Sequence, residues 1–231
     1  MIEGLLLIDK PAGISSFGVV AKVRGIVRAK TGIKKIKVGH TGTLDPAATG
    51  LLVLAIGTYT KRVPSLIKQD KIYEVTMTLG KISSTGDKEG DITKTSDMQP
   101  TKEQIEEALA RFTGELMQTP PTFSAIKVNG QRAYDLARKG KDVQLEPRKI
   151  VIHSNELIAY NYPIVQFASH VGSGTYIRSL VADIGKSLGV GAYMSDLRRT
   201  KIGSYSINDA VKLPDLNTES IQGNIKTLTK L

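Results

Sequence analysis

The apolar runs of this 231-residue chain are short, and their length limits its architecture. One run, Leu5–Ile8, is followed closely by Pro11 and Gly13, and the longest elsewhere, Leu51–Ile56, has six residues. Such runs between turn residues are typical of buried strands, and they fall far short of the roughly 20 apolar residues that cross a membrane. We therefore expect a cytoplasmic protein without a membrane segment.

Positive charge is concentrated in two stretches of the chain. There are 32 Lys and Arg residues against 22 Asp and Glu, a formal charge of +10. Residues 1–40 carry a net charge of +6 and residues 126–150 a net charge of +4, whereas the remainder is balanced. Focused charge of this kind is typical of a surface that binds a polyanion, although two solvated basic faces would give the same counts.

Several classes of chemistry lack the residues that they need. The chain has no cysteine, which excludes disulfides, thiol nucleophiles and Cys-ligated metals. The histidines, His40, His153 and His170, do not pair with a carboxylate at ligand spacing, so we expect no metal site. The glycine-rich segments 39–42 and 172–174 lack the signatures of nucleotide-binding loops, and no serine-hydrolase elbow is present.

The rest of the pattern mixes strand and helix signals. Besides the two apolar runs, strands are expected at residues 72–79, 149–157 and 164–171. Helices are expected after a cap at Ser15 or Ser16, after the Thr101–Gln104 capping box and from about Tyr176 to Leu188. The polar residues 80–100 predict a long surface loop.

Two charged residues and two tyrosines are candidates for chemistry. Asp45 precedes Pro46, which favours a helix start, so its carboxylate is expected to face a helix N-terminus; a plain N-cap is the structural alternative. Arg178 lies in the expected first turn of a helix, where a cation opposes the dipole and calls for an anion; a surface arginine is its alternative. Tyr73 and Tyr176 are either core aromatics or stacking platforms for bases.

A long and specific motif follows the first basic stretch. It reads Gly39-His40-Thr41-Gly42-Thr43-Leu44-Asp45-Pro46-Ala47-Ala48-Thr49-Gly50-Leu51-Leu52, and continues to Gly57 and Thr60-Lys61. It closely resembles the catalytic motif of the TruB family of tRNA pseudouridine synthases, in their bacterial, stand-alone form. The resemblance covers about residues 3–213, with further matching blocks at Asp9-Lys10-Pro11, Ser15-Ser16, Tyr73, Ser84-Thr85-Gly86-Asp87, Pro120-Pro121, Ser124-Ala125-Ile126-Lys127, Gly174-Thr175-Tyr176-Ile177-Arg178 and Leu197-Arg198-Arg199.

The resemblance implies an α+β fold, in which helices flank a mixed, largely antiparallel central sheet. It assigns residues 1–213 to the catalytic domain, with a thumb insertion at about 119–148. Typical bacterial members add a small C-terminal RNA-binding domain. Only about 18 residues follow Leu213 here, so we expect residues 214–231 to form a short tail rather than that full domain.

The resemblance also implies an activity and a set of site residues. The family converts a T-loop uridine of tRNA, position 55 in tRNA numbering, to pseudouridine without a cofactor or metal. Asp45 matches the catalytic aspartate, and Arg178 matches the arginine that pairs with it. Residues around the target base are matched by Tyr73, Tyr176 and Leu197, and the histidine that enters the T-loop is matched by His40.

The thumb insertion is expected to bind the RNA backbone. Its candidate phosphate contacts are Lys127, Arg132, Arg138 and Lys139. The implied partner is the tRNA T-stem-loop, bound by a monomer that needs no protein partner. Two alternatives stay open: a tRNA-binding or folding module without catalysis, and a pseudouridine synthase that acts on another RNA.

Overall fold

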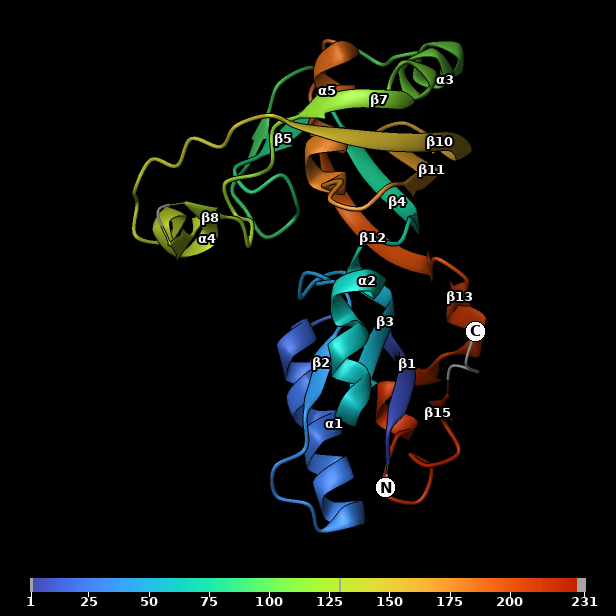
Figure 1. Cartoon of the computed structure of the whole chain (residues 1–231). Coiled ribbons are helices and arrows are strands. Elements are labelled where there is room, and N and C mark those ends of the chain that lie inside the picture. The colour runs from blue at the N-terminus through green and yellow to red at the C-terminus, as the bar shows by residue number, and fades with distance from the viewer. Residues whose placement is uncertain (1, 129, 228–231) are drawn as a thin grey trace. The chain divides into compact units, whose positions relative to one another are not determined.

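The computed structural model describes residues 2–128 and 130–227, and the chain divides into two compact units (Figure 1). The first unit is formed by Met1–Tyr73 and Leu197–Leu231, and the second by Glu74–Asp196. Two strands, β4 (Lys71–Leu79) and β12 (Ala192–Ile202), each run from one unit into the other. Among the described residues, no helix is long and apolar enough to cross a membrane.

The first unit is built on a mixed sheet. Its strand order is β14 (Val211–Lys212), β1 (Gly4–Lys10), β3 (Thr49–Ile56), β12 and β4, with β2 (Val38–His40) paired to β3, β13 (Tyr205–Ser206) to β12 and β15 (Ile225–Lys226) to β1. The β1–β14 and β3–β12 pairs are parallel, and β1–β3 is antiparallel. Short helices complete the unit: a 3-10 helix at Gly57–Arg62, α2 (Val63–Ile67), and 3-10 turns at Ile207–Asp209 and Leu213–Asp215.

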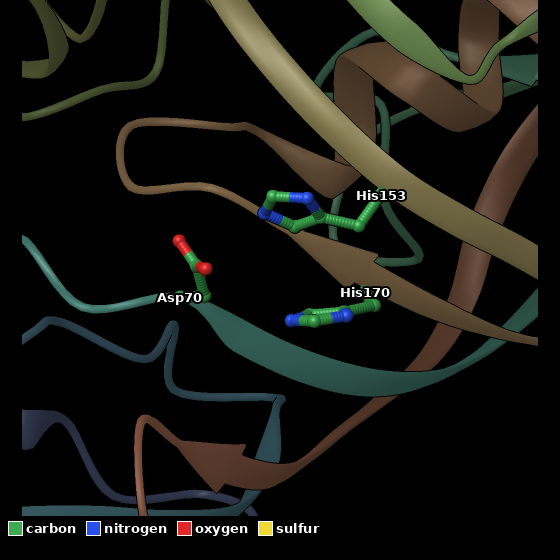
Figure 2. A group of neighbouring side chains, drawn as sticks. All are labelled: Asp70, His153 and His170. Atoms are coloured by element: carbon green, nitrogen blue, oxygen red, sulfur yellow. The ribbon is translucent and has the colours of Figure 1, made fainter.

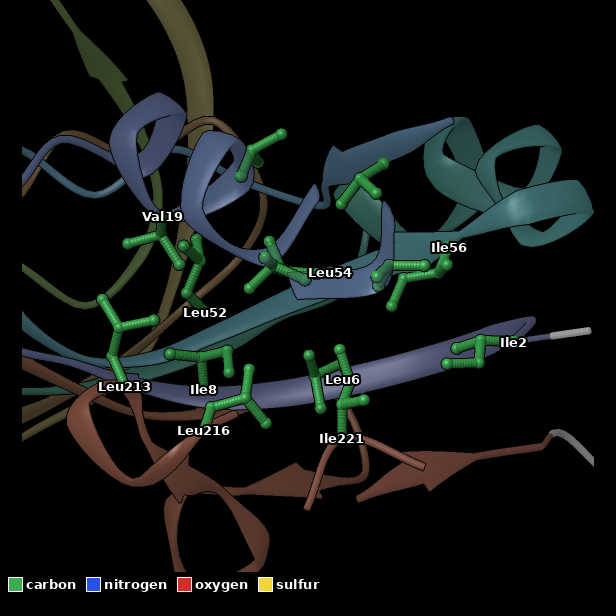
Figure 3. Close-up of a cluster of buried hydrophobic side chains, with 14 of the residues drawn as sticks. Ile2, Leu6, Ile8, Val19, Leu52, Leu54, Ile56, Leu213, Leu216 and Ile221 are labelled. Carbon is green, nitrogen blue, oxygen red and sulfur yellow. The ribbon is translucent and has the colours of Figure 1, made fainter. Parts of the chain in front are cut away.

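Both faces of β1 and β3 are buried, which explains their unbroken apolar runs. On one face, Leu6 and Ile8 pack with Leu52 and Leu54 against the valines of α1 (Ser16–Thr31), among them Val19 (Figure 3). Side chains alternate along a strand, so the neighbouring residues of each run form a second cluster on the opposite face: Leu5, Leu7, Leu51, Val53 and Ala55, with Leu66 and Ile202.

The segment after Leu213 packs into the first unit. Leu216 and Ile221 are buried in the same cluster as Leu6, and Ile225 pairs with Leu6 across the β1–β15 ladder. The C-terminal segment that we expected as a short tail therefore contributes Leu216, Ile221 and Ile225 to the packing of the first unit, and residues 228–231 lie outside the described part.

The second unit contains the remaining strands of the same sheet and helices that accompany them. Its strands follow the order β12, β4, β11 (Ile164–Val171), β10 (Arg148–Asn161) and β7 (Gly114–Gln118), accompanied by α3 (Lys102–Arg111) and α5 (Ile177–Ser187). The α3 helix opens with the predicted capping box at Thr101. The predicted α+β class with a mixed, largely antiparallel sheet is confirmed.

An insertion, which we call the thumb, leaves this sheet between β7 and β10. It contains β8 (Lys127–Val128), β9 (Gln131–Arg132) and α4 (Ala133–Ala137), which stand apart from the sheet of their unit in Figure 1. Gln118 and Arg148, the strand residues that flank it, are direct partners in the β7–β10 ladder.

One prediction for this unit is wrong. Residues 80–100 are not simply a surface loop, because β5 (Lys81–Ser83) and β6 (Ile92–Lys94) form a hairpin within them. The polar composition hid this hairpin, whose exposed strands follow no apolar alternation. Asp87, at its turn, is buried and forms a bridge with Met194 of β12.

Gly50 lets β3 approach β12 closely, and its substitution tests this pairing. Its φ is +102°, and a Cβ there would lie 2.3 Å from the backbone oxygen of Arg199. We expect Gly50→Ala to lower the free energy of unfolding by about 3 kcal/mol, since strain and overlap add. A Cβ on Gly39 meets nothing within 4 Å, so Gly39→Ala is the control in urea unfolding. Equal stability of the two variants would contradict the close approach.

Candidate functional site

Asp45, the predicted catalytic aspartate, is half-buried in the loop between β2 and β3 (residues 41–48), which we call the catalytic loop after that prediction. Its carbonyl accepts the N–H of Ala48 at 3.1 Å, which closes a turn that leads into β3. The prediction that Asp45 faces a helix N-terminus is therefore wrong. An Asp-Pro pair also favours a β-turn, and the buried strand that follows decides between the two.

A buried arginine holds one side of the catalytic loop. Arg199 is 1% exposed. Its Nη2 donates to the carbonyl of Gly42 at 3.0 Å, Nη1 to that of Thr43 at 3.3 Å, and Nε to that of Leu51 at 2.8 Å. Hydrogen bonds from a charged donor are stronger than neutral ones. Arg199 thus fixes the backbone that precedes Asp45 to the first residues of β3.

A buried lysine and a serine hold the other side. Lys10 Nζ donates to the carbonyl of Pro46 at 3.1 Å and to that of Ile14 at 2.9 Å. Ser16 Oγ accepts the N–H of Leu44 at 2.8 Å and donates to its carbonyl at 2.9 Å. Both neighbours of Asp45 in the chain are therefore fixed through polar contacts.

The buried cations change the protonation of this region. Burial lowers the pKa of Lys10 to about 8; the Asp45 carboxylate partly counters this, and Arg199 adds to it. The same causes, burial and then the charge of Arg199, lower the pKa of His40 below its usual value. The N–H of Gly42 donates to His40 Nδ1 at 3.4 Å. His40 therefore faces its surroundings as a neutral imidazole at pH 7, with Nε2–H as donor.

Two further predicted residues belong to the first unit. Tyr73 near the start of β4 is 8% exposed, and Leu197 in β12 is 7% exposed. The carbonyl of Leu197 accepts the hydroxyl of Thr49 at 3.4 Å, which links it to the first residue of β3. The first unit therefore carries His40, Asp45, Tyr73 and Leu197.

Arg178 is buried in the second unit and has an anion partner there. It is the second residue of α5, and its Nη1 lies 3.4 Å from Oδ2 of Asp87. Its guanidinium also donates to the carbonyls of Thr85 at 3.1 Å and Phe123 at 2.8 Å. The alternative of an outward surface arginine is wrong. The pairing of Arg178 with Asp45 stays a prediction.

Tyr176 caps the same helix and is positioned by a glutamine. Gln118, at the end of β7, accepts the N–H of Tyr176 at 2.8 Å and donates to its carbonyl at 3.1 Å. The two bonds fix the backbone from which the Tyr176 ring projects. Gln118 is 4% exposed, and the sequence did not predict its role, because a glutamine at a strand end has no local signal.

The thumb presents three of the four predicted cations around a hollow of about 440 Å³. The hollow is lined by Lys127, Gly130, Gln131, Arg132, Asp135 and Lys139. The guanidinium carbons of Arg132 and Arg138 lie 5.8 and 5.7 Å from the ring centroid of Tyr134. This tyrosine therefore orients two exposed arginines through cation–π contacts.

Buried hydroxyls without a hydrogen-bond partner occur in both site regions. Within the described residues, Thr41 Oγ1 and Ser124 Oγ are buried and unpaired. Thr41 belongs to the catalytic loop, and Ser124 follows the residue whose carbonyl binds Arg178. Unsatisfied buried groups are rare in folded proteins and concentrate where function takes precedence over stability.

Two histidines of the second unit lie close together (Figure 2). The ring centroids of His153 in β10 and His170 in β11 are 4.5 Å apart, where a register shift next to Ser154 interrupts the ladder. Figure 2 also draws Asp70, a residue of the first unit. Two imidazoles alone fall short of the ligand set of a zinc site, so this pair does not establish a metal centre.

Family models and curated relatives both match this chain to pseudouridylate synthases. The family model "TruB family pseudouridylate synthase (N terminal domain)" matches residues 28–177, and "tRNA pseudouridylate synthase B C-terminal domain" matches residues 178–229. The chain is 43% identical over 229 residues to tRNA pseudouridine synthase B of Clostridium acetobutylicum, covering 99% of this chain and 77% of that protein. The homologue of Clostridium tetani is 44% identical over 222 residues, covering 96% of this chain and 75% of its own length.

A solved structure shares the fold. A chain of the crystal structure of a Cbf5-Nop10-Gar1 complex superposes with a TM-score of 0.72 at 28% identity. The match covers 97% of the present chain and 60% of the Cbf5-complex chain, so the present chain spans only part of that neighbour's length.

The buried lysines predict how stability depends on pH. Burial also lowers the pKa of Lys71 to about 8, from 10.5. Between these values the unfolded chain binds more protons than the folded one, so stability rises with pH from about 8 to about 10. Lys71→Met removes one titration and should reduce the gain in unfolding free energy between about pH 7.5 and about pH 9.5. Urea unfolding measures both gains; an undiminished gain in the variant would contradict the assignment.

Proposed function

Because the chain belongs to the TruB family of pseudouridylate synthases, we propose that it isomerises the T-loop uridine of tRNA at position 55 to pseudouridine, with Asp45 as the catalytic carboxylate. One observation carries the assignment of Asp45. The carbonyls before and after it are bound by buried cations, and its neighbour Leu44 is bound by Ser16. A reactive group on a loop needs such support to hold its geometry.

The reaction has several steps in which one carboxylate can take part. The glycosidic bond between C1' and N1 must break, the uracil must turn, and C5 must join C1'. A positioned carboxylate can act in this sequence as a nucleophile or as a base. The overall change is an isomerisation, so its balance requires no cofactor or oxidant.

The other site residues are assigned to contact the target base or to pair with the catalytic carboxylate. We assign Arg178 to pair with Asp45, and Tyr73 to stack on the target uracil. Tyr176 and Leu197 form apolar walls that exclude water and strengthen the electrostatics of the charged pair. His40 enters the T-loop, where a neutral imidazole donor can replace contacts of the displaced base.

RNA capture is assigned to the basic surfaces. The target uridine must leave the stack, at a cost of a few kcal/mol that binding has to offset. The thumb cations Lys127, Arg132, Arg138 and Lys139 supply phosphate contacts, which fix register without reading sequence. We assign catalysis to residues 1–213 and treat 214–231 as a short C-terminal segment. The chain acts as a monomer with RNA as its macromolecular partner.

Replacing the carboxylate tests the assignment of Asp45. Asp45→Asn should abolish pseudouridine formation at the T-loop uridine, because an amide cannot act as a nucleophile or base there. The measurement is site-resolved pseudouridine detection on an unmodified tRNA transcript, without added metal or nucleotide. Asp97→Asn, at an exposed carboxylate, controls for loss of charge and should retain full activity.

Each other outcome would favour a different assignment of function. Unchanged modification by Asp45→Asn would remove this residue from catalysis. Binding of tRNA without modification by the wild type would favour a tRNA-binding or folding module. Modification of a ribosomal RNA fragment in place of tRNA would favour a synthase that acts on another RNA.

Removing thumb charge should change the salt dependence of binding. Each phosphate contact releases counterions and adds about 0.7–0.9 to the slope of log K against log salt concentration. Lys127→Ala combined with Arg132→Ala should weaken tRNA binding and flatten this slope by about 1.5. The control combines Lys102→Ala with Arg111→Ala, two exposed cations of α3. Identical slopes for both double variants would place the thumb outside the contact surface.

A further inference from the structure

Phe17 is the most exposed large apolar side chain in the described part of the molecule. It is 68% exposed, although it is the second residue of a helix whose valines are buried. Single exposed apolar residues are ordinary on protein surfaces and need no explanation. The exposure of Phe17 is informative because of where this residue lies in the first unit.

Phe17 adjoins the segment that supports the catalytic loop. The residue before it, Ser16, exchanges two hydrogen bonds with Leu44. Helical side chains lean toward the helix N-terminus, so the Phe17 ring leans toward the chain that enters α1. That chain is itself joined to the catalytic loop, because the N–H of Gly13 donates to the carbonyl of Pro46 at 2.9 Å. Phe17 therefore directly follows a residue that supports the loop of the proposed catalytic carboxylate.

The surroundings of the ring suit RNA. The first turn of α1 contains no acidic residue, so no carboxylate there repels a phosphate. The exposed residues that precede it are small and uncharged, namely Pro11, Ala12, Gly13 and Ser15, and those farther along the helix include Lys22, Arg28 and Lys30. A docking protein would bury a contiguous apolar patch, whereas a nucleobase needs one aromatic face with cations near its phosphates.

We propose that Phe17 is a base-stacking residue, whose ring packs on a nucleobase adjacent to the flipped uridine. The inference rests on the proposed function, which supplies the RNA and brings the target base to Asp45. Flipping one base out of a stacked loop leaves the face of its neighbour uncovered. An aromatic ring at that face replaces part of the lost stacking, so Phe17 favours the flipped state.

A single fluorescent reporter tests the contact. The chain contains no tryptophan, so Phe17→Trp introduces a unique indole. The Asp45→Asn background prevents turnover during titration with an unmodified T-arm hairpin. We expect quenching of the indole by the stacked base, and no comparable quenching for Ile158→Trp, a site of 57% exposure on β10. An unquenched indole at position 17 would overturn the proposal.

Affinity measurements give a second, independent test of the stacking contact. Phe17→Ala should raise the Kd for the hairpin about tenfold, the usual effect of removing one stacked aromatic, and Phe17→Trp should restore it. Hairpins with one abasic nucleotide at each T-loop position identify the base. At the stacked position, base loss should weaken binding to the wild type but add nothing in Phe17→Ala. Additive losses at every position, or equal losses in the Ala and Trp variants, would overturn the proposal.

The two proposals fail in different ways. A wild type that converts the T-loop uridine while Phe17→Ala matches its KM contradicts only the stacking role. A wild type that leaves that uridine unmodified contradicts the proposed function.

Discussion

The structure of the site depends on cations that are buried against backbone carbonyls. Arg199 binds the chain before Asp45, and Lys10 binds the chain after it. A buried charge is costly unless it is fully hydrogen-bonded, and here the bonds lead to the loop itself. Loosening the loop would remove the carbonyls of Gly42 and Thr43 from Arg199 and that of Pro46 from Lys10. The penalty for an unpaired charge therefore acts as the restraint on a segment without regular secondary structure.

In the second unit, the buried charged group that holds a loop in place is an anion rather than a cation. There a carboxylate, Asp87, is drawn into the interior to meet the guanidinium of Arg178, and it also accepts the hydroxyl of Thr85 at 2.6 Å and the N–H of Glu89 at 3.0 Å. The short hairpin that carries Asp87 is otherwise exposed. Removing one member of such a pair leaves the other buried and uncompensated, so the helix start and the hairpin turn depend on each other.

The sequence predicted the apolar framework well and the polar framework poorly. Strands β1 and β3 and the helix that begins after Ser15 follow directly from apolar runs and a capping residue, and the structure confirms them. Strand β12 was not predicted, because Arg199 at its centre is an inward-facing charge that interrupts the apolar alternation. Asp45 was recognised by its motif, but its turn was not, since Asp-Pro favours a turn and a helix start alike. Pairings between side chains far apart in the chain, such as Gln118 with Tyr176, leave no local trace in a sequence.

The way in which the thumb joins its sheet has a consequence for how freely the inserted segment can vary. The insertion begins after Gln118 and ends before Arg148, and these two residues are direct partners in the β7–β10 ladder. Its two ends are therefore held at a fixed separation by the sheet, whatever lies between them. Changes of length or composition in the inserted segment leave the strand register unaltered, and longer insertions add little closure entropy. Beyond Phe123, whose carbonyl binds Arg178, the inserted segment can thus vary without disturbing the strands on either side of it.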